Sequence, residues 1–231
     1  MLVAIVDDRA DDLLTLEGEL EEAGHQAIAR EMPLSSLDAL VDWLESQGAE
    51  ALVCDQRLSA AHYAAFDGAE AVSHVLRRLR LPSVLVSSFI DTDGISAIRR
   101  WRDRVPVLIG KALLTPDAIN RGFELCRSEL EGDIPPQRVP RRTGVHIESV
   151  YRHGTDLMVE AIVPGWNPQS AVSFPIDLVT EEDLRLRVSD RAVDWVIAKV
   201  NVDAESADEL FFLDFERAPD PADLGVVLGI T

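Results

Sequence analysis

Short apolar runs alternate with amphipathic stretches over the first 130 residues of the chain. The runs predict buried strands at Leu2–Val6, Gln26–Arg30, Ala51–Cys54, Ser83–Ser87 and Val105–Ile109. Between them, apolar residues that recur every three to four positions are typical of helices. We expect these at Ala10–Ala23, Leu34–Ser46, Ala69–Arg80, Ile95–Arg102 and after the predicted N-cap Thr115. Strands that alternate with helices favour an α/β fold with a doubly wound, five-stranded parallel sheet.

This alternation ends at residues 131–144, where three prolines and two glycines with few apolar residues predict a linker. Short runs separated by Gly and Pro turns follow it and predict a small, mainly antiparallel β domain, a barrel or sandwich, over residues 145–231. Its expected strands are Val145–Tyr151, Asp156–Val163, Ala171–Ile176, Leu184–Val188, Trp195–Val202 and Glu209–Glu216, with one helical turn at Thr180–Leu184. Residues 1–130 then form a separate N-terminal domain.

The composition limits the classes of partner. The chain has 231 residues, 47% of them apolar, and 41 acidic against 22 basic residues give a net charge of −19. Nucleic acids and anionic membranes attract basic surfaces, so we expect no nucleic-acid and no membrane partner. The absence of a run of about 18 apolar residues indicates a cytoplasmic protein that meets other proteins. Cys54 and Cys126 end apolar stretches and are expected in the core.

Polar residues stand where four of the predicted strands end. Asp7 and Asp8 follow the first strand, Asp55 the third and Lys111 the fifth, and Ser87, or its neighbour Ser88, ends the fourth. Lys111 is one of only two lysines in the chain. The carboxyl ends of parallel strands converge on one edge of a sheet, so these side chains are expected in one pocket. Three carboxylates there require compensation by an ammonium group and a divalent cation.

This pattern resembles the receiver domain of two-component response regulators over residues 1–130. The intervals of 48, 32 and 24 residues between Asp7, Asp55, Ser87 and Lys111 suit that family. The segments Phe66-Asp-Gly-Ala-Glu-Ala and Leu81-Pro-Ser-Val-Leu-Val-Ser-Ser resemble its entries into the third helix and the fourth strand. The resemblance implies a flavodoxin-like sheet with strand order 2-1-3-4-5.

The resemblance also implies a phosphorelay chemistry. Asp55 would accept a phosphoryl group from a histidine kinase or phosphotransfer protein and become an aspartyl phosphate. Mg²⁺ would be held by Asp7, Asp8, Asp55 and the backbone carbonyl of Arg57, while Lys111 and Ser87 would bind the phosphoryl oxygens. Such a protein is not an enzyme with an external product, because it catalyses only its own phosphorylation and dephosphorylation. A homodimer is possible in this family.

Three departures from the family pattern are present. Ala112 stands where a proline usually follows the lysine, so we expect a trans peptide bond there and a differently shaped loop. Leu108 replaces an aromatic residue that the family often couples to the serine. The segment Leu58–Phe66 is longer than usual, and it can form a flap that supplies His62 or Tyr63 to the pocket.

These departures leave a second hypothesis open, a pseudo-receiver that regulates by protein contact without phosphorylation. A phosphatase of the haloacid dehalogenase type is disfavoured, because Arg57 stands where that family needs its second acid. Residues 143–231, with 6 basic and 17 acidic residues, show no helix-turn-helix or metal pattern, so we expect an interaction or dimerisation module. His146 and His153 have no assigned function, and Trp166 and Trp195 are expected in the core. The arginines after the fourth strand form either a solvated helix face or a docking surface: Arg99, Arg100, Arg102 and Arg104.

Overall fold

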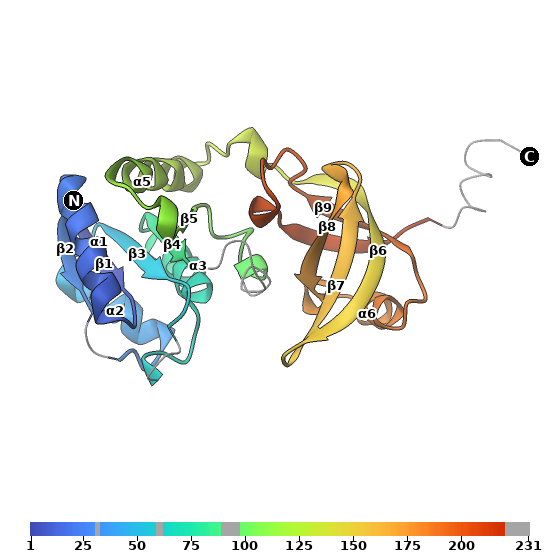
Figure 1. Cartoon of the computed structure of the whole chain (residues 1–231), viewed down its shortest axis with the longest axis horizontal. Helices are drawn as coiled ribbons and strands as arrows, with labels where there is room; N and C mark the ends of the chain where they lie inside the picture. Colours follow the sequence, from blue (N-terminus) through green and yellow to red (C-terminus); the bar gives the residue numbers. More distant parts are fainter. Residues whose placement is uncertain (31–32, 59–61, 89–97, 220–231) are drawn as a thin grey trace, which may run out of the picture. The chain divides into compact units, whose positions relative to one another are not determined.

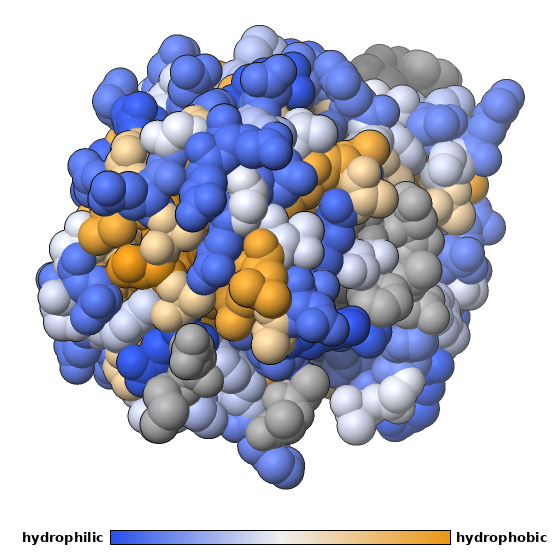
Figure 2. Space-filling model, turned by 60° about the vertical axis from the view of Figure 1, so that its left-hand side comes forward, coloured by the Kyte–Doolittle hydropathy of each residue, from blue (hydrophilic) through white to orange (hydrophobic). Residues whose placement is uncertain are grey.

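The computed structural model describes residues 1–30, 33–58, 62–88 and 98–219. The chain divides into two compact units, Met1–Pro135 and Pro136–Thr231 (Figure 1). None of the helices described in either unit is both long and apolar enough to cross a membrane. The molecular face in Figure 2 is mainly hydrophilic, and its apolar residues are interrupted by polar ones, which suits the high net charge.

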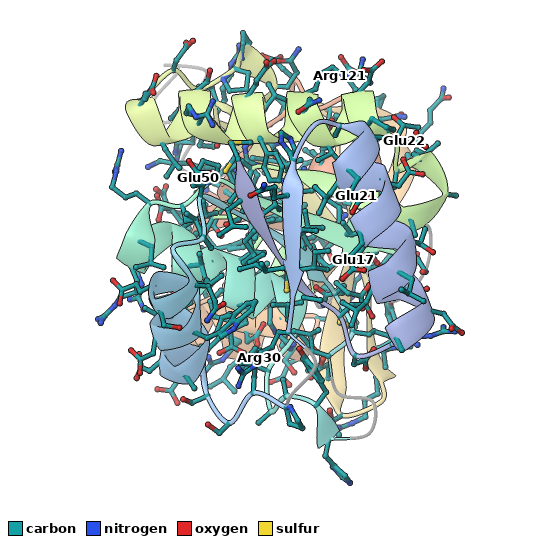
Figure 3. The ribbon with its side chains drawn as sticks, turned by 90° about the vertical axis from the view of Figure 1, so that its left-hand side faces the viewer. Glu17, Glu21, Glu22, Arg30, Glu50 and Arg121 are labelled. Atoms are coloured by element: carbon teal, nitrogen blue, oxygen red, sulfur yellow. The ribbon has the colours of Figure 1, made fainter. Side chains whose placement is uncertain are left out.

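The N-terminal unit is built on a parallel sheet with strand order β2-β1-β3-β4-β5, which confirms the predicted topology. Its strands are β1 (Leu2–Val6), β2 (Gln26–Ala29), β3 (Ala51–Asp55), β4 (Ser83–Ser87) and β5 (Leu108–Gly110). Its helices are α1 (Ala10–Glu22), α2 (Leu37–Gln47), α3 (Gly68–Leu79) and α5 (Pro116–Glu131). Helices α1 and α2 lie on opposite sides of the sheet (Figure 3). Every residue of β3 and β4 is buried, as expected for central strands covered on both faces.

Local sequence signals define the helix ends. The side chains of Ser36 and Thr115 cap α2 and α5 by accepting hydrogen bonds from the backbone N–H groups of the third residue along. Gly48 and Gly132 end the same two helices with φ values of 66° and 97°, a left-handed conformation that glycine adopts without strain.

Several boundaries in this unit differ from the prediction, most by a single residue. The second helix begins at Leu37 instead of Leu34, because Ser36 caps it and Leu34 forms a single parallel bridge with Ala64. The fifth strand is the shorter segment Leu108–Gly110. The predicted helix Ile95–Arg102 falls partly outside the described residues, and what is described shows helical residues only at 98–99 before a turn.

The arginines after β4 do not form a uniformly solvated face. Arg99 and Arg102 are buried, at 3% and 4% exposure. The guanidinium of Arg102 donates hydrogen bonds to the backbone carbonyls of Val105 and Pro106. Arg102 therefore has a structural role, in which it supports the chain that enters β5.

The C-terminal unit contains one antiparallel sheet with strand order β10-β9-β6-β7-β8, which confirms the antiparallel prediction. Its elements are β6 (Arg141–His153), β7 (Asp156–Val163), β8 (Asn167–Pro175), α6 (Glu182–Ser189), β9 (Trp195–Val200) and β10 (Phe212–Arg217). The rings of Phe174 in β8 and Phe212 in β10 are 4.7 Å apart. These edge strands would be about 19 Å apart in a flat sheet, so the sheet curls strongly toward a barrel.

Two predicted segments in or next to this unit have a different secondary structure. Residues 141–144, expected in the linker, form the start of β6. Leu184–Val188, expected as a strand, lies inside α6, where Leu184 and Val188 are buried and Leu186 is 56% exposed. An alternating apolar pattern therefore misled the prediction, because the two buried residues are four apart and share one helix face.

The tryptophans of this unit have different environments. Trp166 packs partly against the core and donates a hydrogen bond of 2.9 Å from its ring Nε1 to the carbonyl of Ala204. Trp195 is 46% exposed, so the core expectation is wrong for it. Its ring covers Gly144 and lies 4.7 Å from the ring of His146.

Gly68, the first residue of helix α3, packs very closely against the backbone at the end of β3. A Cβ atom added at Gly68 would lie 1.9 Å from the backbone oxygen of Asp55, so a larger residue must displace the helix or the strand end. We predict that Gly68→Ala lowers the free energy of unfolding of the N-terminal unit by about 2 kcal/mol or more. Urea unfolding followed by the helical circular dichroism signal measures this change.

Gly18→Ala is the matched control for this prediction. Gly18 lies in α1 with no atom within 4 Å of an added Cβ, so this substitution is expected to stabilise the helix by about 0.5–1 kcal/mol. Equal effects of the two substitutions would contradict the close-contact explanation.

Candidate functional site

The strand ends of the N-terminal unit converge as the sequence predicts. Cys54 of β3 pairs with Val6 of β1, and Ser87 of β4 pairs with Gly110 of β5. This register places the residues that follow β1 and β5 beside the ends of β3 and β4. A cavity of ≈ 240 Å³ lies at this edge, and it is lined by Asp8, Arg9, Asp12, Asp55, Gln56, Arg57, Ser87, Ser88 and Lys111.

Lys111 is the cationic centre of this group. Its Nζ lies 2.9 Å from Asp7 Oδ2, 2.9 Å from Asp55 Oδ1 and 2.7 Å from Asp12 Oδ2. The contacts to Asp7 and Asp55 join residues that the sequence analysis had placed in one pocket. Asp12 was missed, although side chains in the first turn of a helix lean back toward its N-terminus, here the end of β1.

Burial and unequal charge shift the ionisation of this cluster. Burial raises the pKa of Asp7 and of Asp55, and Lys111 only partly offsets that effect. Burial lowers the pKa of Lys111, but hydrogen bonds to Asp12, Asp55 and Asp7 outweigh it and leave the pKa above its ordinary value. Three carboxylates thus share one ammonium group. Since the nearby Asp8 adds a fourth acid, the cluster favours further positive charge.

The acidic side chains fit a hard divalent cation. Carboxylate oxygens of Asp7, Asp8 and Asp55 lie within 4.8 Å of one another, with Asp7 and Asp55 buried and Asp8 half-buried. Asp7 Oδ1 accepts a hydrogen bond of 2.9 Å from the N–H of Arg9, and Asp55 Oδ2 accepts one of 2.7 Å from Arg57. These backbone contacts fix the carboxylates, and oxygen ligands are those that Mg²⁺ prefers. The expected carbonyl ligand of Arg57 stays a prediction.

Gln56 and Gly68 support the Asp55 backbone. Gln56 was not predicted, and Gly68 was expected only as part of the entry into the third helix. The Gln56 side-chain Oε1 accepts a hydrogen bond of 3.0 Å from Ala69 N–H, and its backbone carbonyl accepts one of 2.9 Å from Gly68 N–H. Gln56 is buried, and its contacts fix the start of α3 against the end of β3. An amide directly after the candidate acceptor was the available signal.

The residues at the ends of β4 and β5 keep part of the expected arrangement. Ser87 is buried at 1% exposure at the end of β4, whereas the alternative Ser88 is exposed, and both line the cavity. Lys111 begins a short 3₁₀ helix, Lys111–Leu113, and no described peptide bond is cis, which confirms the trans bond expected before Ala112. Leu108 lies half-buried at the start of β5, in the place where the family often has an aromatic ring.

The long segment after Asp55 contributes a side chain near the acids. Tyr63 is buried, and its hydroxyl donates a hydrogen bond of 2.6 Å to the carbonyl of Arg30. Tyr63 lines a separate cavity of ≈ 440 Å³ that also contacts Asp7 and Asp8, while His62 is exposed and lines neither of these two cavities. Tyr63 therefore lines a cavity that includes Asp7 and Asp8 but not Lys111, and residues 59–61 of this segment lie outside the described part.

Comparisons with known proteins find similarity in solved structures. No family model and no curated protein matches the chain. The signal receiver domain of a modulated diguanylate cyclase from Desulfovibrio desulfuricans G20 is similar with a TM-score of 0.45 and 19% identity, over 57% of this chain and 97% of that one. The N-terminal domain of a response regulator/sensory box/GGDEF 3-domain protein from Carboxydothermus hydrogenoformans gives 0.43 and 17%, over 58% and 98%.

A response regulator receiver domain protein from Clostridium thermocellum gives a TM-score of 0.42 and 13% identity, over 56% of this chain and 96% of that one. The similar structures are receiver domains, and the resemblance covers the N-terminal part of the chain. Identities this low concern the fold, so the roles of individual residues rest on the contacts within this chain.

The charge imbalance leads to a prediction about Mg²⁺. We expect Mg²⁺ at ten times its Kd to raise the free energy of unfolding of the N-terminal unit by about 1.4 kcal/mol, because it binds the folded acids. Asp8→Asn removes one ligand and should abolish most of this gain. Asp11→Asn is the control, since Asp11 is an exposed acid in the first turn of α1. Thermal unfolding with and without Mg²⁺ measures the gain, and an equal response of the two variants would refute the assigned site.

Proposed function

We propose that the N-terminal unit is a phosphoacceptor domain of a phosphorelay, in which Asp55 receives a phosphoryl group from a phosphohistidine donor. The proposal rests on the position of Asp55. Its carboxylate lines the cavity at the end of a buried strand, with one oxygen on Lys111 and the other on the N–H of Arg57. A carboxylate fixed in this way is ready to act as a nucleophile.

The transfer is a displacement at phosphorus. A carboxylate oxygen of Asp55 forms the new bond to phosphorus, and the bond from phosphorus to the donor's imidazole nitrogen breaks. Lys111 donates hydrogen bonds to the phosphoryl oxygens and offsets the charge that develops on them. Asp7, Asp8, Asp55 and the carbonyl of Arg57 would hold Mg²⁺, which would supply further neutralisation of the phosphoryl oxygens. Ser87 then donates its hydroxyl to the new phosphoryl group.

The expected partners follow from this chemistry. The donor is a histidine kinase or a phosphotransfer protein, and the protein acts as a response regulator in two-component signal transduction. We propose that the C-terminal unit is the output module and binds another protein, because its 17 acidic against 6 basic residues over 143–231 disfavour nucleic acid. Homodimerisation and location in the cytoplasm remain part of the proposal.

The second candidate is a pseudo-receiver that acts by protein contact alone. It is favoured by the saturation of Lys111, because each of its three N–H donors has a carboxylate partner. The changes at Leu108 and Ala112 also favour it. Hydrolysis of external phosphate esters has little support, since Arg57 stands at the position where the haloacid dehalogenase mechanism requires an acid.

Incubation with acetyl phosphate and Mg²⁺ tests the proposal. Intact-mass measurement is expected to show a gain of one phosphoryl group in the wild type and none in Asp55→Asn. Omission of Mg²⁺ should suppress the gain. No gain in the wild type, together with no beryllofluoride binding, would establish the pseudo-receiver instead.

A further inference from the structure

We propose that Asp12 restrains phosphorylation, because it competes with the incoming phosphoryl group for Lys111. This inference rests on the proposed function of Asp55. It assigns a role to a residue that does not follow directly from a strand end and that the sequence pattern did not predict. Asp12 acts through Lys111 and is therefore a positioning residue.

The first support is the geometry at the ammonium group. A lysine ammonium has three N–H donors and no acceptor. In this structure Asp7, Asp55 and Asp12 each lie within 2.9 Å of Lys111 Nζ, and the contact to Asp12 is the shortest at 2.7 Å. If Asp55 keeps its own contact, a phosphoryl oxygen on Asp55 must replace Asp7 or Asp12 as a partner of Lys111.

Asp12 is the partner that a phosphoryl group would displace. The Asp7 carboxylate is wholly buried and is also held by the N–H of Arg9. The Asp12 carboxylate is 27% exposed, and its other ion-pair contact is Arg9 Nε at a longer 3.8 Å. Asp12 lines the cavity beside Asp55 and Lys111, so its carboxylate can turn outward to water when the phosphoryl group arrives.

The charge of α1 adds a second argument. The helix contains no Lys or Arg between Ala10 and Glu22, and Glu17, Glu21 and Glu22 extend from it in Figure 3. The helix itself therefore offers Asp12 no basic partner. A phosphoryl group brings two negative charges near Asp12, and like charges at short range disfavour each other. Neutralising Asp12 would remove this repulsion and make both Lys111 and Arg9 more available to the phosphoryl oxygens.

NMR of the lysine side chains can observe Lys111 directly. The chain has only two lysines, so lysine labelled at Cε and Nζ gives two side-chain NMR signals. Lys199 is the internal reference, since it pairs with Asp214 on the surface of the other unit at 2.7 Å. We expect Asp12→Asn and Asp12→Ala to shift the Lys111 signal and to speed exchange of its ammonium protons with water, while the Lys199 signal stays unchanged.

The second measurement is beryllofluoride affinity at saturating Mg²⁺, in the full-length protein. A partly exposed ion pair contributes up to about 1 kcal/mol, so Asp12→Asn should bind beryllofluoride up to about fivefold more tightly than the wild type. Asp12→Ala lacks the side-chain acceptor and should show at least the same gain. Asp11→Asn removes an exposed charge from the same helical turn and is expected to match the wild type.

The outcomes separate this inference from the proposed function. A Lys111 signal that is identical in the wild type and both Asp12 variants would show that Asp12 does not hold Lys111. A shifted signal with unchanged or weaker beryllofluoride binding, against tight binding in the wild type, would overturn the competition alone. A shifted signal with no binding in any protein would refute the phosphoacceptor function, and the competition with it. Looser structure weakens binding, so tighter binding cannot arise from a merely structural effect.

Discussion

The functional edge of this protein depends on one ammonium group surrounded by too many carboxylates. Lys111 contacts Asp7, Asp12 and Asp55 within 2.9 Å in a largely buried setting. Burial raises the pKa of Asp7 and Asp55, and Lys111 only partly offsets this effect. The resulting need for positive charge explains why the site suits Mg²⁺. In the proposed function, the distribution of the three lysine N–H donors would control access for a phosphoryl group.

The sheet and its helices keep this unfavourable cluster together. The parallel strand order brings residues more than a hundred positions apart to one edge of the sheet. The fully buried strands β3 and β4 fix the positions of Asp55 and Ser87, their last residues, at this edge. Gly68 allows α3 to approach the Asp55 backbone, while Gln56 binds the first turn of that helix. Hydrophobic packing of the layers thus stabilises an arrangement of charges that would repel one another in isolation.

The pocket residues could be predicted, because four of the predicted strands are short apolar runs that end at a polar residue. The strand order followed from the resemblance to receiver domains. Asp12 could not, since it does not follow directly from a strand end and an acid in the first turn of a helix is common. The strand predicted at Leu184–Val188 failed because apolar residues two apart fit a strand while those four apart fit a helix. Trp195 is 46% exposed, and its ring lies over Gly144 of the neighbouring strand, a contact that depends on strand register.

The C-terminal unit is a curled antiparallel sheet with an acidic composition. Its proposed output role requires that the edge at Asp55 be a working cation site. The most direct test is a crystal grown with Mn²⁺ as a Mg²⁺ substitute, in which anomalous scattering locates the metal. The charge imbalance around Lys111 predicts one strong peak in contact with carboxylate oxygens of Asp8 and Asp55. Absence of a peak at this edge under saturating Mn²⁺, or a peak only elsewhere, would contradict the account.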